Sequence, residues 1–151
     1  MSLEPVVSAG ALEAVLAGAS LISNGLSEYV TFDPEPAHVV GTGGAIGAVL
    51  RHWVWLRFSS ERFPWPTLVV NVLGSFGFGL AIFAGASESM MQLVGTGICG
   101  AFTTFSSFSV ETVRLYERGD RLLAVANAAG NLALSLAAIG LAWGIVAVGT
   151  F

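Results

Sequence analysis

Three long stretches without a charged residue constrain this chain more than any other feature of its sequence. They cover residues 63–87, 89–110 and 122–151. Each can hold the roughly 20 residues that a helix needs to cross the hydrocarbon core of a bilayer. Because such a helix satisfies its own backbone hydrogen bonds, it is stable among membrane lipid. With 54% hydrophobic and 11% charged residues overall, the sequence predicts an all-α, multi-pass protein of the cell membrane.

A fourth stretch is apolar but carries charge. It runs from Val39 to Phe58, with Arg51 and His52 near its middle and an aliphatic and aromatic run after them. We interpret it as a spanning helix that contains an arginine. The predicted spans are therefore about 39–58, 67–86, 90–116 and 122–149.

The first 37 residues are predicted to be an N-terminal extension, separate from a four-span domain at 38–151. Residues 6–26 are moderately apolar but include Glu13, so a surface helix and a marginal extra span are both open alternatives. The Asp-Pro-Glu-Pro run at 33–36 predicts a linker.

The charges and reactive residues exclude several classes of function. The net charge is −4 and the six basic residues, all arginine, form no patch, so nucleic acid is not an expected partner. The acidic excess without lysine is typical of a salt-adapted organism. The single cysteine, Cys99, predicts a small buried side chain rather than a disulfide or metal ligand. No paired carboxylates, histidine cluster or nucleophile with its base is visible, so an enzyme is not expected.

Two pairs of glycines predict close helix packing. Gly43 and Gly47 are four residues apart in the first span, and Gly140 and Gly144 repeat this spacing in the last. In lipid, small residues at this spacing let the backbone of another helix approach closely.

The middle of the third span is unlike a helix that faces lipid. Residues 100–109 read Gly-Ala-Phe-Thr-Thr-Phe-Ser-Ser-Phe-Ser. Phe102, Phe105 and Phe108 recur every three residues and predict one aromatic stripe with a hydroxyl stripe beside it. Because ring edges carry positive character, they can replace water around a small anion without trapping it. The alternative is that the rings pack helices and the hydroxyls bond to the preceding helical turn.

Uncharged polar residues in two other spans extend this pattern. Asn71 lies near the start of the second span, and Asn127, Asn131 and Ser135 share one face of the last span at positions i, i+4 and i+8. Amides in lipid need an interior partner or a wet path. A lone asparagine would most simply join two helices, whereas this set favours a polar track.

These motifs resemble the Fluc or CrcB family of fluoride channels over about residues 41–149. The resemblance rests on Gly43-Gly44-x-x-Gly47-x-x-x-Arg51, Pro66-Thr67-Leu68-x-Val70-Asn71-x-x-Gly74 and Gly97-x-Cys99-Gly100-x-Phe102-Thr103-Thr104-Phe105-Ser106-Ser107-Phe108-Ser109-x-Glu111. It implies four spans with the third helix broken near its middle, assembled as an antiparallel dual-topology dimer. It also implies passive export of fluoride, which lowers fluoride toxicity in the cytoplasm.

The resemblance implies roles for individual residues. Phe105 and Phe108 correspond to the rings that line each of two pores, and Asn71 to the amide donor that meets the ion. Arg51 corresponds to a vestibule arginine that attracts anions, with an arginine snorkelling to the interface as the alternative. The fluoride pathway that we expect consists of Asn71, Phe105, Phe108, Thr104, Ser107, Asn127, Asn131, Ser135 and Arg51.

A sodium ion is the one cofactor that the resemblance implies. The backbone carbonyls of Gly100 and Thr103 correspond to its ligands, taken from both subunits at the dimer centre. Carbonyls freed at a broken helix suit sodium, since hard cations prefer oxygen and irregular backbone in a bilayer must be satisfied.

The arginines predict an orientation. Arg57 and Arg62 lie between the first two spans, and Arg114, Arg118 and Arg121 between the last two. Under the positive-inside rule these loops face the cytoplasm and the orientation is fixed. Since the family pore needs one subunit of each orientation, we hypothesise that this chain forms a heterodimer with an oppositely oriented homologous subunit, and a homodimer is the alternative.

Two other functions remain open at this point. A proton-coupled exporter of the small four-span, dual-topology type needs a titratable carboxylate deep in its first helix, whereas the first span here has Arg51 and no acidic residue. A membrane scaffold would explain the glycine pairs but not the coincidence of phenylalanine, asparagine and hydroxyl stripes. A fluoride channel is therefore the leading hypothesis.

Overall fold

The chain divides into two units, Met1–Pro34 and Glu35–Phe151. The computed structural model describes the following residues: 10, 13–14, 16–21, 34–58 and 62–149. In the first unit the described residues are helical. The choice between a surface helix and an extra span for residues 6–26 depends on residues outside the described part of the chain.

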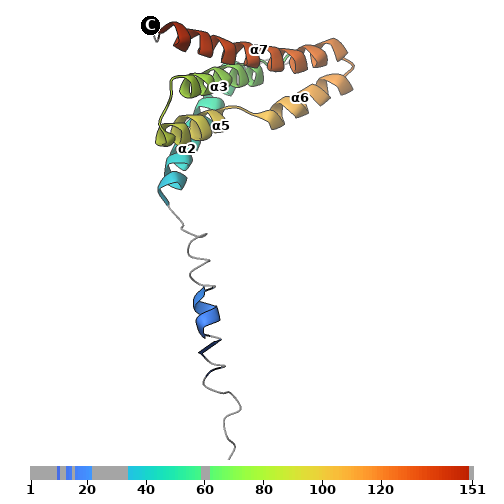
Figure 1. Cartoon of the computed structure of the whole chain (residues 1–151). Coiled ribbons are helices and arrows are strands. Elements are labelled where there is room, and N and C mark those ends of the chain that lie inside the picture. The colour runs from blue at the N-terminus through green and yellow to red at the C-terminus, as the bar shows by residue number, and fades with distance from the viewer. Residues whose placement is uncertain (1–9, 11–12, 15, 22–33, 59–61, 150–151) are drawn as a thin grey trace, which may run out of the picture. The chain divides into compact units, whose positions relative to one another are not determined.

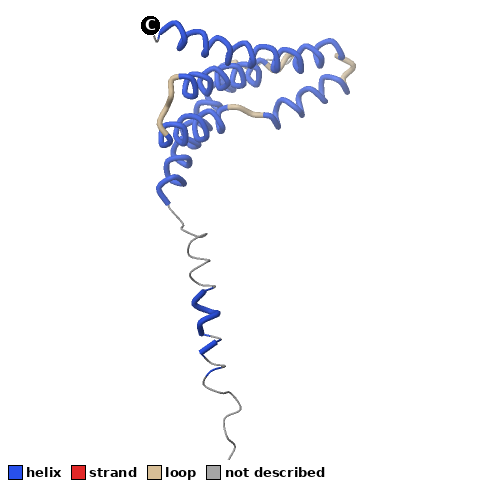
Figure 2. The backbone as a smooth tube through the Cα atoms, viewed as in Figure 1, coloured by secondary structure: helices blue, strands red, loops and turns tan. Residues whose placement is uncertain are grey.

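The second unit is built from helices, as Figures 1 and 2 show. In chain order they are α2 (Pro34–Arg57), α3 (Trp65–Phe83), α4 (Glu88–Met90), η1 (Met91–Cys99), α5 (Gly100–Phe102), α6 (Phe105–Glu117) and α7 (Arg121–Gly149). No strand occurs among the described residues. The predicted all-α fold class is confirmed.

Three helical segments are long and apolar enough to cross a membrane. They are Trp65–Phe83, Glu88–Glu117 and Arg121–Gly149, which match the predicted second, third and fourth spans. The helix of the first predicted span, α2, has 24 residues. It is more polar than the other three because Arg51 and His52 interrupt its apolar run.

Proline residues mark the start of two helices. α2 begins at Pro34, and α3 has a proline in its first turn. Proline suits a first turn because its φ is already helical and the N–H that it lacks would have no partner there. Residues 34–36 of the predicted linker are helical and belong to α2, and the boundary between the two units falls at Pro34. The second span likewise begins two residues earlier than expected.

The third crossing is not a uniform α-helix. After α4 come nine residues of π-helix, η1, in which hydrogen bonds join residues five apart. The N–H of Gly100, for example, donates to the carbonyl of Gly95. π-Helical turns are frequently found at functional sites. No sequence motif predicted this one.

Helices α3 and α7 lie side by side and form the largest contact of the unit. At this contact Gly79 faces Ile139 and Ala142, and a Cβ at Gly79 would lie 3.0 Å from the Cβ of Ala142. A Cβ at Gly140 or at Gly144 would meet nothing within 4 Å among the described residues. Within the chain, α7 therefore makes its close contact with α3 at Ala142 and not at this glycine pair.

The glycine pair of α2 packs directly on η1. A Cβ at Gly43 would collide with the backbone carbonyl of Leu93, and one at Gly47 with that of Ile98. The Cα of Gly97 would lie only 3.0 Å from the Cβ at Gly43, so the two helices cross at facing glycines. The predicted close approach is confirmed, and it fixes α2 against the third crossing.

Replacing Gly43 with alanine should push α2 away from η1. The new methyl group would meet backbone atoms that cannot rotate aside, so we expect a loss of about 1–3 kcal/mol of stability. Thermal unfolding of the purified protein in detergent, followed by circular dichroism, measures this loss. Gly44→Ala is the matched control, because a Cβ at Gly44 meets nothing within 4 Å and alanine is the better helix former. Equal unfolding temperatures for the two variants would contradict the packing.

Candidate functional site

The third crossing breaks between α5 and α6, where Figure 2 shows a short loop. Thr103 and Thr104 have extended backbone, with φ −78° and ψ 162° for the first and φ −152° and ψ 116° for the second. The predicted break is confirmed. The predicted three-ring stripe is wrong in one respect, because Phe102 ends α5 while Phe105 and Phe108 belong to α6.

The side chain of Asn71, on α3, closes the break. Its Oδ1 accepts the N–H of Thr104 at 2.8 Å, and its Nδ2 donates to the carbonyl of Thr104 at 3.2 Å. A side-chain amide thus supplies the partners that both backbone groups of Thr104 lose when the helix stops. Backbone groups without a hydrogen-bond partner are not tolerated in a bilayer. This pair of hydrogen bonds therefore allows the helix to break inside the membrane.

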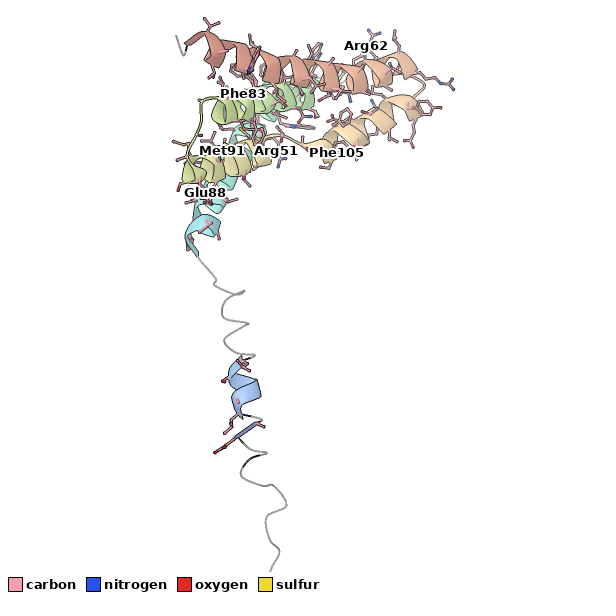
Figure 3. The ribbon with its side chains drawn as sticks, viewed as in Figure 1. Arg51, Arg62, Phe83, Glu88, Met91 and Phe105 are labelled. Carbon is pink, nitrogen blue, oxygen red and sulfur yellow. The ribbon has the colours of Figure 1, made fainter. Side chains whose placement is uncertain are left out.

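The break also frees backbone carbonyls on the α5 side. In a continuous helix the N–H of Thr104 would bond to the carbonyl of Gly100, but Asn71 takes that N–H instead. The carbonyl of Thr103 accepts a hydrogen bond from Arg51 Nη1 at 3.4 Å, and Figure 3 shows Arg51 beside the break. The guanidinium of Arg51 therefore faces the C-terminal end of α5, where the helix dipole favours a positive charge.

Asn71 begins a chain of hydrogen bonds that we call the amide ladder, formed by Asn71, Asn131, Asn127 and Thr112. Asn71 Nδ2 donates to Asn131 Oδ1 (2.9 Å), Asn131 Nδ2 to Asn127 Oδ1 (3.0 Å), Asn127 Nδ2 to Thr112 Oγ1 (2.8 Å), and Thr112 Oγ1 to the Phe108 carbonyl (2.7 Å). In every one of these bonds, the side chain donates to the next group along the ladder. The ladder thus starts at the Thr104 backbone and ends at that of Phe108, and it ties the start of α6 to α3 and α7.

The N-terminal end of α6 is held by the first residue of the amide ladder, Asn71, which bonds to the backbone of Thr104. Thr104 is its N-cap, with Oγ1 accepting the N–H of Ser107 at 3.2 Å. The N–H groups of Phe105 and Ser106, in the first turn, have no carbonyl partner within the helix. Together with the helix dipole they give this end of α6 a partial positive charge, so an anion is favoured there.

A cavity of about 480 Å³, which we call the break cavity, opens beside the interrupted helix. Three parts of the unit line it: α3, the third crossing and α7. The wall consists of Asn71, Ser75, Thr103, Thr104, Phe105, Phe108, Ala128, Asn131, Leu132 and Ser135. No charged side chain is among them, so the cavity offers amides, hydroxyls and rings only.

Most of the predicted site residues meet in this cavity, and four do not. Asn127 is fully buried within the amide ladder. The hydroxyl of Ser107 accepts a hydrogen bond from Thr104, the N-cap of α6. Arg51 contacts the break at the carbonyl of Thr103. Gly100 lines a second cavity of about 360 Å³, together with Cys99 and Thr103.

Ser75 lines the break cavity but was absent from the predicted site. It lies four residues after Asn71 on α3, so both side chains are on one face of the helix. The spacing of four residues from Asn71 is the sequence signal that could have identified Ser75 as a site residue. The family motif ends at Gly74, which is why the motif alone did not include it.

The two aromatic rings of the wall differ in exposure. The ring centroids of Phe105 and Phe108 are 5.7 Å apart and the ring planes meet at 48°, a tilted arrangement that presents edges as well as faces. Phe105 is 79% exposed in the single chain, and Figure 3 shows it at the start of α6. A large apolar ring is thus left uncovered at the mouth of the cavity.

Glu111, the acidic residue after the phenylalanine motif, lies outside the wall of the break cavity. Its Oε2 and the Oγ1 of Thr67 are buried oxygens without a hydrogen-bond partner in the described part of the chain. The carboxylate of Glu111 lies near the Thr67 side chain and the positive charge of Arg114. Within the described residues no group of three or more His, Cys, Asp or Glu side chains could hold a metal ion.

Comparison with known proteins gives a consistent result. The family model described as "CrcB-like protein, Camphor Resistance (CrcB)" matches residues 38–144. The "Fluoride-specific ion channel FluC 2" of Haloarcula marismortui is 58% identical over 114 residues, covering 76% of this chain and 96% of the relative. The "Fluoride-specific ion channel FluC 1" of Halobacterium salinarum is 48% identical over 112 residues, covering 74% and 94%. The "Fluoride-specific ion channel FluC" of Agrobacterium fabrum is 45% identical over 116 residues, covering 70% and 93%.

Replacing Asn71 with leucine should loosen the start of α6. The change leaves the N–H and carbonyl of Thr104 without partners, at roughly 1–3 kcal/mol for each buried group. Hydrogen exchange of the peptide that covers residues 103–108 should be much faster than in the parent protein. Ser109→Ala is the control, since its exposed hydroxyl only bonds back to Phe105. Unchanged exchange in Asn71→Leu would show that Asn71 does not hold the break.

Proposed function

The chain belongs to the CrcB family, and from that membership we propose that it is a fluoride-specific ion channel, which lets fluoride leave the cell passively and so lowers its toxicity in the cytoplasm. It is a channel and not an enzyme. The observation that carries this proposal is the break cavity, whose wall has rings, hydroxyls and amides but no charged side chain. Conduction needs binding that is strong enough for entry and weak enough for release, and a wall without full charges meets that condition.

Three neutral features of the cavity favour an anion. The N-terminal end of α6 supplies a partial positive charge. The tilted rings of Phe105 and Phe108 present edges with positive character. Hydroxyl groups of the wall can replace part of the hydration shell. A small, strongly hydrated ion such as fluoride needs all three, because its dehydration is costly.

We propose four membrane crossings, with α2 as the first. Gly43 and Gly47 of α2 pack on the third crossing, so α2 must lie in the same layer as the other three. Arg51 places a charge inside α2, and its hydrogen bond to the Thr103 carbonyl keeps that charge paired inside the protein.

We propose that two subunits assemble in antiparallel orientation. Phe105 is 79% exposed, and a partner would cover its ring at the mouth of the cavity. Figure 3 places Arg62 at the end of the unit where α6 turns into α7. Both arginine-bearing loops therefore lie on one side, and the positive-inside rule gives the chain one orientation. This bias favours a homologous chain of opposite bias as the partner, because a second copy would have to insert against its own arginines.

A structural sodium ion fits the oxygen atoms at the end of α5. The carbonyl of Gly100 has lost the N–H that a continuous helix would provide, and the carbonyl of Thr103 keeps a second lone pair beside its bond to Arg51. Hard cations prefer such oxygens. We propose that these two carbonyls, with their equivalents in the partner, hold the ion and so stabilise the break.

The second candidate function is a proton-coupled exporter. Such a carrier needs a carboxylate deep in its first helix. The acidic residue of α2 is Glu35, in its first turn, far from the break in sequence. Passive conduction is therefore the better explanation.

Liposomes loaded with fluoride and containing the purified chain should lose fluoride in the absence of a pH gradient. Replacing Phe108 with isoleucine removes a ring edge from the wall, so we expect a flux about tenfold lower, equivalent to about 1.4 kcal/mol of lost ion stabilisation. A fluoride electrode measures the efflux. Phe83→Ile is the matched control, because Phe83 ends α3 and lines neither cavity.

The same assay separates the alternatives. Efflux that requires a proton gradient would favour the exporter. Efflux only after a homologous chain of opposite orientation is added would identify a heterodimer. Vesicles that stay sealed under both conditions would refute the proposed function.

A further inference from the structure

The hydrogen bonds around the break cavity leave few donors free for an ion. Both hydrogens of Asn71 Nδ2 are used, one by the carbonyl of Thr104 and one by Asn131 Oδ1. Asn131 Nδ2 is directed at the carbonyl and the Oδ1 of Asn127, at 3.0 Å each. Neither amide in the wall therefore has a hydrogen left over for an ion in the cavity.

The threonine hydroxyls of the wall are used in the same way. Thr103 Oγ1 donates to the carbonyl of Cys99 at 3.0 Å, and Thr104 Oγ1 donates to Ser107 Oγ at 3.1 Å. Two side-chain donors in the wall remain, Ser75 on α3 and Ser135 on α7. Among the described residues neither serine forms a hydrogen bond.

Two helical hydroxyls close to the break bond back to their own helix, whereas that of Ser75 does not. Ser109 and Thr112 both donate to the carbonyl four residues earlier, at 2.9 and 2.7 Å, which is the common partner of a helical hydroxyl. Ser75 makes no such bond to the carbonyl of Asn71. A donor without a partner in a membrane segment is costly unless water or a solute pairs with it.

We propose that Ser75 donates a hydrogen bond to fluoride in the break cavity, while Asn71 and Asn131 hold the wall in position. The proposal rests on the proposed function and names a contact for its ion. A hydroxyl donating to an anion forms a short, strong bond, and the small serine side chain leaves room for the ion itself. Ser75 and Thr103 also line the second cavity, so Ser75 lies where the two cavities adjoin.

Fluoride efflux from liposomes that contain the full chain tests this assignment, with three variants of one position. Ser75→Ala removes the donor and should lower the flux about tenfold at low fluoride concentration, the usual loss for one bond to a charged group. Ser75→Thr keeps the hydroxyl and should stay within about threefold of the parent protein. Ser75→Cys offers a weaker donor of similar size and should be intermediate. Thr42→Ala removes a hydroxyl from α2 that lines neither cavity and should have no effect.

The concentration dependence distinguishes a contact from a packing effect. Loss of a contact should raise the fluoride concentration that gives half-maximal flux in Ser75→Ala but not in Ser75→Thr. Equal flux in Ser75→Ala and the parent protein would overturn the proposal, and so would equal losses in the alanine and threonine variants. If Ser75→Ala does not assemble, the order of the threonine and cysteine variants decides in the same way. A parent protein that conducts nothing would refute the proposed function, whereas these outcomes refute only the role of Ser75.

Discussion

The double hydrogen bond between the Asn71 amide and the backbone of Thr104 is the interaction on which the rest of the structure depends. The Asn71 amide accepts a hydrogen bond from the N–H of Thr104 and donates one to its carbonyl, as a neighbouring backbone segment would. Because a bilayer offers no water to an exposed peptide group, a helix cannot stop in its middle without such a partner. A leucine at this position would force the third crossing either to continue or to leave the membrane core.

The two helix ends that the break creates carry opposite partial charges. The end of α5 presents carbonyls and meets the guanidinium of Arg51, whereas the start of α6 presents N–H groups to the break cavity. A broken helix can in this way favour a cation on one side and an anion on the other. The amide ladder keeps the second end in place, since it returns to α6 at the carbonyl of Phe108. The asparagines that the sequence suggests as ion contacts also hold this wall together through their hydrogen bonds to one another.

The spanning helices could be predicted from the sequence because lipid imposes one strong requirement, a long uncharged stretch. The break and most of the cavity wall followed from motif residues such as Asn71, Phe105 and Phe108. What could not be predicted depends on contacts between distant segments. The π-helix has no local motif. Arg51 reaches the break only because facing glycines bring α2 against η1. Ser75 stands out only because the amides and threonine hydroxyls of the wall already donate to other protein groups.

Chemical blocking of the break cavity tests most directly whether the ion passes through it. In a Cys99→Ala background, a cysteine at Ser135 places a thiol in the wall, and one at Leu134 places it on the adjacent, 48% exposed position of α7. Treatment with a small methanethiosulfonate reagent should abolish fluoride efflux in the Ser135→Cys protein and leave that of Leu134→Cys unchanged. Full efflux after complete labelling at position 135 would contradict a route through the cavity.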